Sequence, residues 1–228
     1  MSDNIVSALV PMKGHSERVP SKNTRILGGV PLFYHILRIL TQVKQVGEIL
    51  VDTDSDKIKD FIRKDFQKVI IIDRPVELIG DKVAMTAIIE HDCGFVKTKN
   101  FLQTHATSPF IKPETIDAAI SAYFKGILSG TDSVMSVNKF QSRFYDSNKK
   151  PINHNPDIML PSQDMPAIYE DCSSFYINSV ERLLKSKKRV GDNPILFELS
   201  KFESADIDTK EDFALCEAIY EFLNKNKK

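Results

Sequence analysis

Short β-branched runs alternate with longer amphipathic stretches over the first two-thirds of the chain, an order that few folds accommodate. Strands separated by helices of this length form βαβ units and a mainly parallel sheet. The length of 228 residues fits one large domain. We therefore predict an α/β fold. The expected strands are 5–10, 48–53, 68–72, 100–104 and 132–137, and the expected helices are 31–43, 56–64, 83–92 and 113–125.

Local residues support the starts of three of these helices. Proline suits the first helical turn, where its missing N–H would have no partner, and Pro31 and Pro113 stand at such positions. Asp54 or Ser55 can cap the helix that begins at residue 56, because short polar side chains accept hydrogen bonds from its free N–H groups. These signals agree with the boundaries drawn from the periodicity.

The pattern changes between residues 138 and 166, where a polar stretch is combined with four prolines. Regular structure is expected to resume with a strand at 174–178 and a helix from Ser179. A strand at 195–199 and a helix at 210–224 complete the chain. We predict that residues 138–166 form a small lobe that protrudes from a single domain spanning residues 1–228.

Composition excludes several classes of partner. Lys and Arg together number 31, as do Asp and Glu, so the net charge of zero gives no support for nucleic acid or an acidic membrane. Apolar runs such as 5–10 and 69–72 are too short to span a bilayer, and the first residues lack the features of a secretory signal. Three scattered cysteines suit a reducing compartment. We expect a cytoplasmic protein.

The loop from Pro11 to Asn23 follows the first predicted strand and is the first candidate site, because parallel sheets bind ligands beyond the carboxyl ends of their strands. It carries three cations, Lys13, Arg18 and Lys22, with small and polar residues between them. A triphosphate requires cationic groups and free backbone donors at close range. The loop lacks the Walker-type glycine pattern. Taken alone, its composition fits a solvated basic loop equally well.

Asp206 and Asp208 form the second candidate site. Two carboxylates one residue apart in extended backbone point to the same side, and together they can hold a hard cation such as Mg²⁺. The alternative is structural, because Asp208 or Thr209 can cap the following helix, with Glu211 or Asp212 completing a capping box. The sequence alone supports both interpretations, and Asp206 is not required for the cap.

The turn from Thr104 to Pro109 is a weaker candidate. It follows a predicted strand and offers hydroxyls and an imidazole, which can bind a polyhydroxylated ligand but are also ordinary turn residues. His105 is a possible base, although a lone histidine is more often structural.

Six segments resemble, in the same order, those of the acylneuraminate cytidylyltransferases (CMP-sialic acid synthetases). The first is the loop 11–23 with its continuation 25–32. The others are Val51-Asp-Thr-Asp54, Arg74-Pro75, Ala106-Thr-Ser-Pro109, Ser174-Phe-Tyr-Ile177 and Asp206-Ile-Asp-Thr209. They cover nearly the whole chain, and six ordered matches are far more specific than any one of them.

The resemblance implies a Rossmann-like nucleotidyltransferase (GT-A-like) fold with a small protruding dimerisation lobe. It implies a homodimer in which that lobe helps to complete the partner's active site. It also implies a Mg²⁺-dependent reaction with CTP, in which the anomeric C2 hydroxyl of a sialic-acid-like nonulosonic acid attacks the α-phosphorus and pyrophosphate leaves.

The resemblance also assigns residues to roles. Asp206 and Asp208 are the implied magnesium ligands and, with Lys13 and Lys22, the implied catalytic residues. The implied sugar-binding residues are His105, Thr107, Ser108 and Tyr176. The implied nucleotide-binding residues are Pro11, Lys13, Gly14, Ser16, Arg18, Lys22, Asn23 and Arg74.

Two positions depart from the family pattern. Met12-Lys13 stands where the family commonly has Ala-Arg, and lysine keeps the charge without bidentate phosphate geometry. His105 stands where glutamine is common in the family, at a position that faces the sugar in family members. The sequence does not decide whether the general base is a metal-bound hydroxyl or His105. Two other functions stay open: a transferase that joins another NTP to a sugar-1-phosphate, and a non-catalytic nucleotide-binding homologue.

Overall fold

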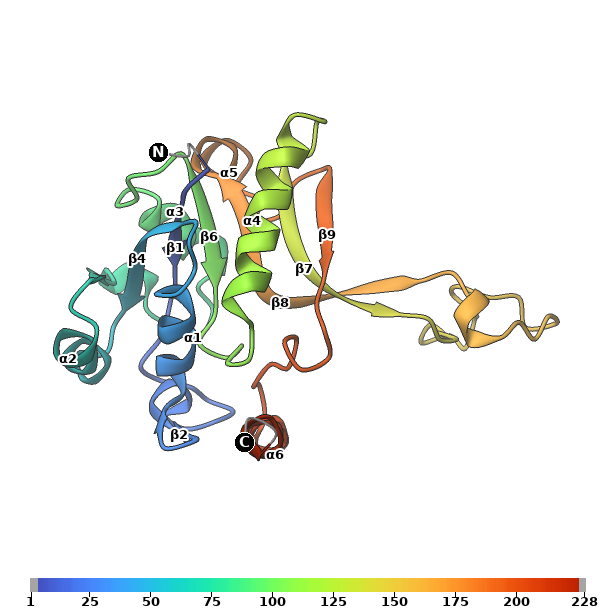
Figure 1. Ribbon diagram of the computed structural model, residues 1–228, viewed down its shortest axis with the longest axis horizontal. Helices are drawn as coiled ribbons and strands as arrows, with labels where there is room; N and C mark the ends of the chain where they lie inside the picture. Colours follow the sequence, from blue (N-terminus) through green and yellow to red (C-terminus); the bar gives the residue numbers. More distant parts are fainter. Residues whose placement is uncertain (1–3, 226–228) are drawn as a thin grey trace.

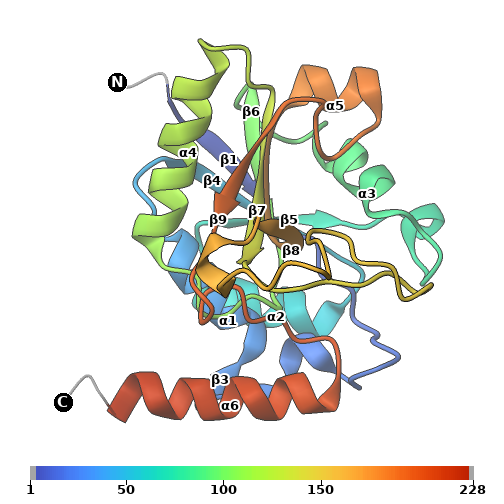
Figure 2. The ribbon, with the colours of Figure 1, turned by 90° about the vertical axis from the view of Figure 1, so that its right-hand side faces the viewer.

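The computed structural model describes residues 4–225 and shows a seven-stranded sheet with helices on both faces (Figure 1, Figure 2). The strand order is β5-β4-β1-β6-β8-β7-β9. A separate hairpin pairs β2 (Ile26–Leu27) with β3 (Val30–Pro31). The sheet strands are β1 (Val6–Leu9), β4 (Val46–Thr53), β5 (Val69–Asp73), β6 (Asn100–Thr104), β7 (Ser133–Phe140), β8 (Ile168–Ser179) and β9 (Pro194–Glu198).

Helices follow most of these strands. They are α1 (Leu32–Leu40), α2 (Asp56–Asp65), α3 (Met85–Asp92), α4 (Pro113–Ile127), α5 (Val180–Ser186) and α6 (Lys210–Lys225). Across residues 4–225, none of them combines the length and the apolar character that crossing a membrane requires.

Strand β8 runs against both of its neighbours, β6 and β7, whereas all the other pairings in the sheet are parallel. The remaining strands therefore share one direction, and their carboxyl ends lie along one edge of the sheet. This arrangement confirms the predicted α/β fold with a mainly parallel sheet.

The two faces of the sheet are covered by different helices. Ala8 and Val10 pack with α1, α2 and α4, while Leu9 between them packs with α3 and α5. Leu50 and Val51 divide between the two faces in the same way. Full burial of an aliphatic side chain contributes about 1.5–3 kcal/mol. Burial on both faces explains why these strands are nearly continuous apolar runs in the sequence.

All the predicted strands and helices are present, with ends that differ by a few residues. Ser55 caps α2, since its Oγ accepts a hydrogen bond from the N–H of Ile58 at 3.4 Å. Asp54 accepts a hydrogen bond from the N–H of Gly14 at 2.6 Å instead. Pro113 opens α4 as predicted, whereas Pro31 ends β3 and immediately precedes α1.

β7 and β8 continue beyond the sheet as a two-stranded ribbon that pairs Phe140 with Ile168. The residues between them, 141–167, form an arm that extends far from the body of the molecule (Figure 1). The arm contains a short 3-10 helix (Ser162–Asp164) and leaves several large apolar side chains exposed, with Met159 82% exposed.

Helix α6 packs on the β2–β3 hairpin, and this contact also holds the segment just before α6 in place. Ile207 and Phe213 are fully buried there with Leu27. Gly28 adopts a φ of 57°, and a Cβ on it would lie 2.0 Å from the ring of Tyr220. This position therefore requires glycine, and the hairpin and α6 fit together only with that close approach.

Candidate active site

A cleft of about 350 Å³ opens at the carboxyl ends of β1, β5 and β6, and the segment after β9 contributes to its wall. Many of the predicted site residues line it although they are far apart in the sequence. The nucleotide set contributes Pro11, Lys13, Lys22, Asn23 and Arg74. The sugar set contributes His105 and Thr107, and the metal set contributes both Asp206 and Asp208.

Five predicted residues lie outside the lining of the cleft. Ser108 is fully buried, and its hydroxyl has no hydrogen-bond partner among residues 4–225; Tyr176 is also fully buried. Ser16 is nearly buried, and Gly14 contacts Asp54 as described above. Arg18 lies at the rim, with its Nη2 3.0 Å from Oδ1 of Asp208.

The loop from Pro11 to Asn23 is a structured element rather than a solvated one. The side-chain amide of Asn23 donates to the carbonyl of Lys13 at 2.9 Å. The Lys22 side chain is only 16% exposed, and its Nζ donates to the carbonyl of Ile207 at 2.8 Å. Lys13 forms an ion pair with Asp81 across the cleft. The folded loop thus presents ammonium groups toward a shared space, which the solvated-surface interpretation does not explain.

The acidic pair lies opposite the loop. Ile207 is buried under α6, and the two aspartates that flank it both line the cleft. Oδ1 of Asp208 lies 3.3 Å from Nζ of Lys22, in addition to its contact with Arg18. Burial raises the pKa of Asp206, and the charge of Asp208 adds to that effect, while a hydrogen bond from Thr107 opposes it.

The helix cap is made without the side chain of either aspartate of the pair, although the backbone N–H of Asp208 also donates to Oδ2 of Asp212, at 3.1 Å. Oδ2 of Asp212 accepts from the N–H of Thr209 at 2.7 Å, and Oγ1 of Thr209 accepts from the N–H of Asp212 at 3.2 Å. This reciprocal pair is a capping box with Thr209 as the cap. The carboxylates of Asp206 and Asp208 are therefore available to a ligand. Two such oxygen donors whose charges repel each other suit a hard divalent cation.

Arg74 is held in the wall of the cleft by Asp52, which has a second buried acid, Asp92, beside it that the sequence did not reveal. Its Nε donates to Oδ1 of Asp52 at 2.5 Å, and Asp52 is fully buried. Burial raises the pKa of the neighbouring Asp92, and a hydrogen bond with Asp52 raises it further. Asp92 therefore keeps its proton at neutral pH, and Asp52 forms the ion pair with Arg74.

His91 completes this group. Its Nδ1 lies 3.2 Å from Oδ1 of Asp92 and 3.7 Å from Oδ2 of Asp52. The three donor atoms lie within 4.8 Å of one another, a spacing that a metal ion could bridge. Arg74 already supplies a positive charge beside Asp52, so the acids do not require a metal ion for charge balance. We therefore interpret the three residues as a support that holds the arginine in place. Nothing in the local sequence links Asp92 to Asp52, which lies on another element.

His105 is neutral in the cleft. Burial lowers its pKa to about 4, and the charges of Arg189 and Lys22 act in the same direction. Its Nε2 lies 2.7 Å from Nε2 of Gln103, so the amide donates and the imidazole carries its proton on Nδ1. A group with so low a pKa is a weak base at neutral pH, which argues against His105 as the general base.

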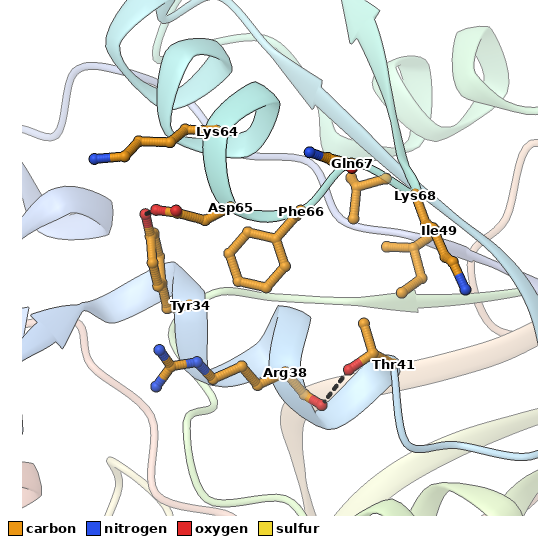
Figure 3. A pocket seen from close by; sticks show the side chains of 10 residues that line it. Tyr34, Arg38, Thr41, Ile49, Lys64, Asp65, Phe66, Gln67 and Lys68 are labelled. Carbon is orange, nitrogen blue, oxygen red and sulfur yellow. Dashed lines mark hydrogen bonds between the residues drawn. The ribbon is translucent and has the colours of Figure 1, made fainter.

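A second hollow, of about 710 Å³, lies between α1 and the end of α2 (Figure 3). It lies near the start of β5, at the amino ends of the parallel strands, whereas the cleft lies at their carboxyl ends. Its polar groups contact one another: the hydroxyl of Tyr34 donates to Asp65 at 2.5 Å, and Arg38 lies over the Tyr34 ring. None of the predicted site residues lines it.

The sequence pattern of the cytidylyltransferase family matches residues 7–225. The chain belongs to this family. A CMP-N,N'-diacetyllegionaminic acid synthase of Legionella pneumophila is 30% identical over 95% of this chain and 96% of its own length. A pseudaminic acid cytidylyltransferase of Campylobacter jejuni is 22% identical over 93% of this chain and 94% of its own length.

Solved structures agree at the level of the fold. A CMP:2-keto-3-deoxy-manno-octonic acid synthetase complexed with CTP superposes with a TM-score of 0.70 at 14% identity, over 97% of this chain and 99% of that one. A 4-diphosphocytidyl-2C-methyl-D-erythritol synthase from Anaerococcus prevotii gives 0.66 at 15% identity, over 96% and 97%. The cytidylyltransferase therefore has the Rossmann-like nucleotidyltransferase fold that the sequence predicted.

Proposed function

We propose that this cytidylyltransferase transfers CMP from CTP to the anomeric hydroxyl of a nonulosonic acid and releases pyrophosphate. The observation that supports this best is the cleft itself, in which the ammonium groups of the first loop face the carboxylates of Asp206 and Asp208. The relatives named above, which act in the activation of legionaminic and pseudaminic acids, support the sugar class.

Lys13 and Lys22 would bind the triphosphate. In the structure they contact Asp81 and Asp208, and on binding CTP the phosphate oxygens would take the place of these carboxylates as partners of the two ammonium groups. Arg18 at the rim would act on the phosphates in the same way. Arg74 lines the same cleft, fixed by Asp52 and almost fully buried, and would contact the nucleoside end of CTP.

Asp206 and Asp208 would hold Mg²⁺ through their carboxylate oxygens. When bound, that cation supplies charge neutralisation to the phosphates and to the leaving pyrophosphate. The sugar hydroxyl forms a bond to the α-phosphorus while the bond to the β-phosphate oxygen breaks, and the hydroxyl proton is released. The chain's own contribution is to place both substrates in one cleft and to keep positive charge beside the phosphates.

The arm supports a homodimer. It extends from the body with Ile152, Ile158 and Met159 exposed, and large apolar side chains on a projecting ribbon are costly unless another surface covers them. We propose that a second copy of the chain covers the arm, and that the arm helps to complete the partner's cleft. A cytoplasmic location follows from the need for CTP and belongs to the same proposal.

The test is pyrophosphate release in the presence of Mg²⁺ and CTP, with a panel of N-acetylneuraminic, N,N'-diacetyllegionaminic and pseudaminic acids. We expect release with at least one acid and none without an acceptor. Absence of release across the panel contradicts the proposed function. Thermal-shift measurements with CTP, UTP, GTP and ATP test the nucleotide, since only the preferred one should raise the melting temperature strongly.

A further inference from the structure

Arg189 is a cation in the cleft that the sequence patterns did not single out. It lies on the connection between α5 and β9, and its side chain is partly buried against the wall. Its backbone carbonyl accepts a hydrogen bond from the side-chain amide of Asn178 at 3.1 Å. The connection is thereby tied to the end of β8, so the position of Arg189 is set by the sheet.

The ring of Tyr176 supports the guanidinium of Arg189. The central carbon of the guanidinium lies 3.9 Å from the centre of the ring. The hydroxyl of Tyr176 lies 2.7 and 2.8 Å from the two carboxylate oxygens of Asp171 and 2.9 Å from Oγ of Ser173. Because that hydroxyl is occupied and the residue is fully buried, Tyr176 serves as a platform for Arg189 rather than as a contact for the sugar.

Within the described part of the chain, residues 4–225, no carboxylate lies within 4.0 Å of the guanidinium nitrogens of Arg189. The other basic residues that line the cleft each have one: Lys13 contacts Asp81, Lys22 contacts Asp208 and Arg74 contacts Asp52. Among the ion pairs formed within residues 4–225, none includes Arg189. A positioned arginine in a cleft with its donors free is suited to bind an anionic group of a ligand.

Arg189 lies in the part of the cleft near His105. Its charge lowers the pKa of His105, and so does that of Lys22 from the phosphate-binding loop. His105 thus lies within electrostatic reach of both cations, and being neutral it adds no positive charge of its own. Ser173, which also lines the cleft, contacts the platform from the same strand.

We infer that Arg189 binds the carboxylate of the acceptor sugar acid. This inference rests on the proposed function. The acceptor carries its carboxylate on the carbon next to the one whose hydroxyl attacks, so whichever group holds the carboxylate also orients the nucleophile. The proposed function assigns the loop cations to the triphosphate, and Arg74 is paired with Asp52, which leaves Arg189 for this role. A planar guanidinium can hold both carboxylate oxygens at once.

The experiment compares an acceptor with its uncharged analogue. The acid that gives the highest pyrophosphate release in the panel and its C1 amide are titrated calorimetrically into the protein, with Mg²⁺ and a non-hydrolysable CTP analogue present. We expect the wild-type protein to bind the acid more tightly than the amide. Arg189→Gln should weaken binding of the acid about 10- to 100-fold, to the level of the amide, and leave the amide and the CTP analogue unaffected.

Two further variants sharpen the result. Arg189→Lys keeps the charge but loses the bidentate geometry, so its affinity for the acid should fall between those of the wild type and Arg189→Gln. Lys188→Gln removes the same charge from the neighbouring exposed residue, which contacts Asp192, and should behave as the wild type.

Two outcomes overturn the inference. One is an Arg189→Gln variant that binds the acid as the wild type does, and the other is an equal loss for acid and amide, which would place Arg189 on another part of the sugar. Failure of the proposed function is distinct, because then no acid in the panel gives pyrophosphate in the first experiment.

Discussion

Asp208 and Thr209 are neighbours with separate roles, and the hydrogen bonds around them show why. The reciprocal contacts of the helix cap join Thr209 to Asp212, so the side chain of Asp208 is left to the cleft. The sequence could not decide between these roles, because both residues are good caps at adjacent positions. The residue at which α6 begins determines which of the two caps the helix.

We expect Asp208→Asn to lower kcat by about 100-fold or more, because a ligand for the cation is lost, with little change in the melting temperature. Thr209→Ala is the matched control. It should lower the free energy of unfolding by about 1 kcal/mol through loss of the cap and keep the same dependence of activity on Mg²⁺ concentration. Denaturant unfolding and Mg²⁺ titrations of both variants measure this. A large loss of stability in Asp208→Asn, with normal turnover, would contradict the assignment.

The carboxyl pair beneath Arg74 makes stability depend on pH. Burial, and then the hydrogen bond and charge of Asp52, raise the pKa of Asp92 above its ordinary value, so the folded protein retains a proton that the unfolded chain releases. The stability contributed by Asp92 is therefore complete below about pH 4 and is lost as the pH rises toward the raised pKa. One retained proton changes the free energy of unfolding by at most about 1.4 kcal/mol per pH unit.

Asp92→Asn tests this linkage, because the amide has the shape of the protonated acid and does not titrate. Urea unfolding between about pH 5 and pH 8 should show a steeper loss of stability for the wild type than for the variant. The difference between the two proteins removes the contributions of all other titrating groups. Parallel curves over that range would show that Asp92 is ionised in the folded protein.

At the scale of elements, the docking of α6 on the β2–β3 hairpin positions the acidic pair. Ile207 is buried in that contact, and its neighbours Asp206 and Asp208 line the cleft as a consequence. Gly28 is the point of closest approach between the hairpin and the helix.

Gly28→Ala should therefore loosen α6. Both Gly28 and Gly29 have left-handed φ, at 57° and 87°, which costs about 1–2 kcal/mol when alanine is introduced. Only Gly28 faces the Tyr220 ring, whereas a Cβ on Gly29 meets nothing within 4 Å. We expect Gly28→Ala to lower the free energy of unfolding more than Gly29→Ala does. Gly28→Ala should also lower Mg²⁺-dependent turnover. Equal losses in the two variants would show that the close approach is unimportant.

Elements were predictable where a local pattern determines them. The central strands are apolar on both faces, and helices such as α2 after Ser55 and α4 at Pro113 begin at recognisable residues, so their presence follows from the sequence. The length of β8 was not predictable, because its first half pairs with β7 outside the core and is largely exposed. Its position between β6 and β7, which sets Ser173 and Tyr176 beside the cleft, depends on contacts between distant segments.

The same division holds for the site. The loop cations, Arg74 and the acidic pair came from motifs contiguous in sequence. Arg189 and Asp92 did not, since each acts through a residue on another element: Tyr176 for Arg189, and Asp52 for Asp92. Tyr176 was predicted to contact the sugar. In the structure its side chain is fully buried and its ring supports the guanidinium of Arg189, which lines the cleft.

For the whole molecule, the arm predicts a homodimer whose cleft depends on both copies. Met159→Glu places a charge on an 82% exposed apolar side chain of the arm. Leu128→Glu is the control, because Leu128 is 89% exposed at the end of α4, away from the arm. Light scattering with size-exclusion chromatography should show a dimer for the wild type and Leu128→Glu, and dissociation with loss of turnover for Met159→Glu. A monomeric wild type would contradict this prediction.

The most direct test of the central claim is the identity of the products, followed by ³¹P NMR with CTP, Mg²⁺ and the preferred nonulosonic acid. Attack by the sugar hydroxyl on the α-phosphorus predicts that the three CTP resonances are replaced by one phosphodiester resonance and by pyrophosphate, in equal amounts. A nucleoside diphosphate sugar that forms only when a sugar-1-phosphate is supplied, or CTP that persists with every acid, would contradict the account.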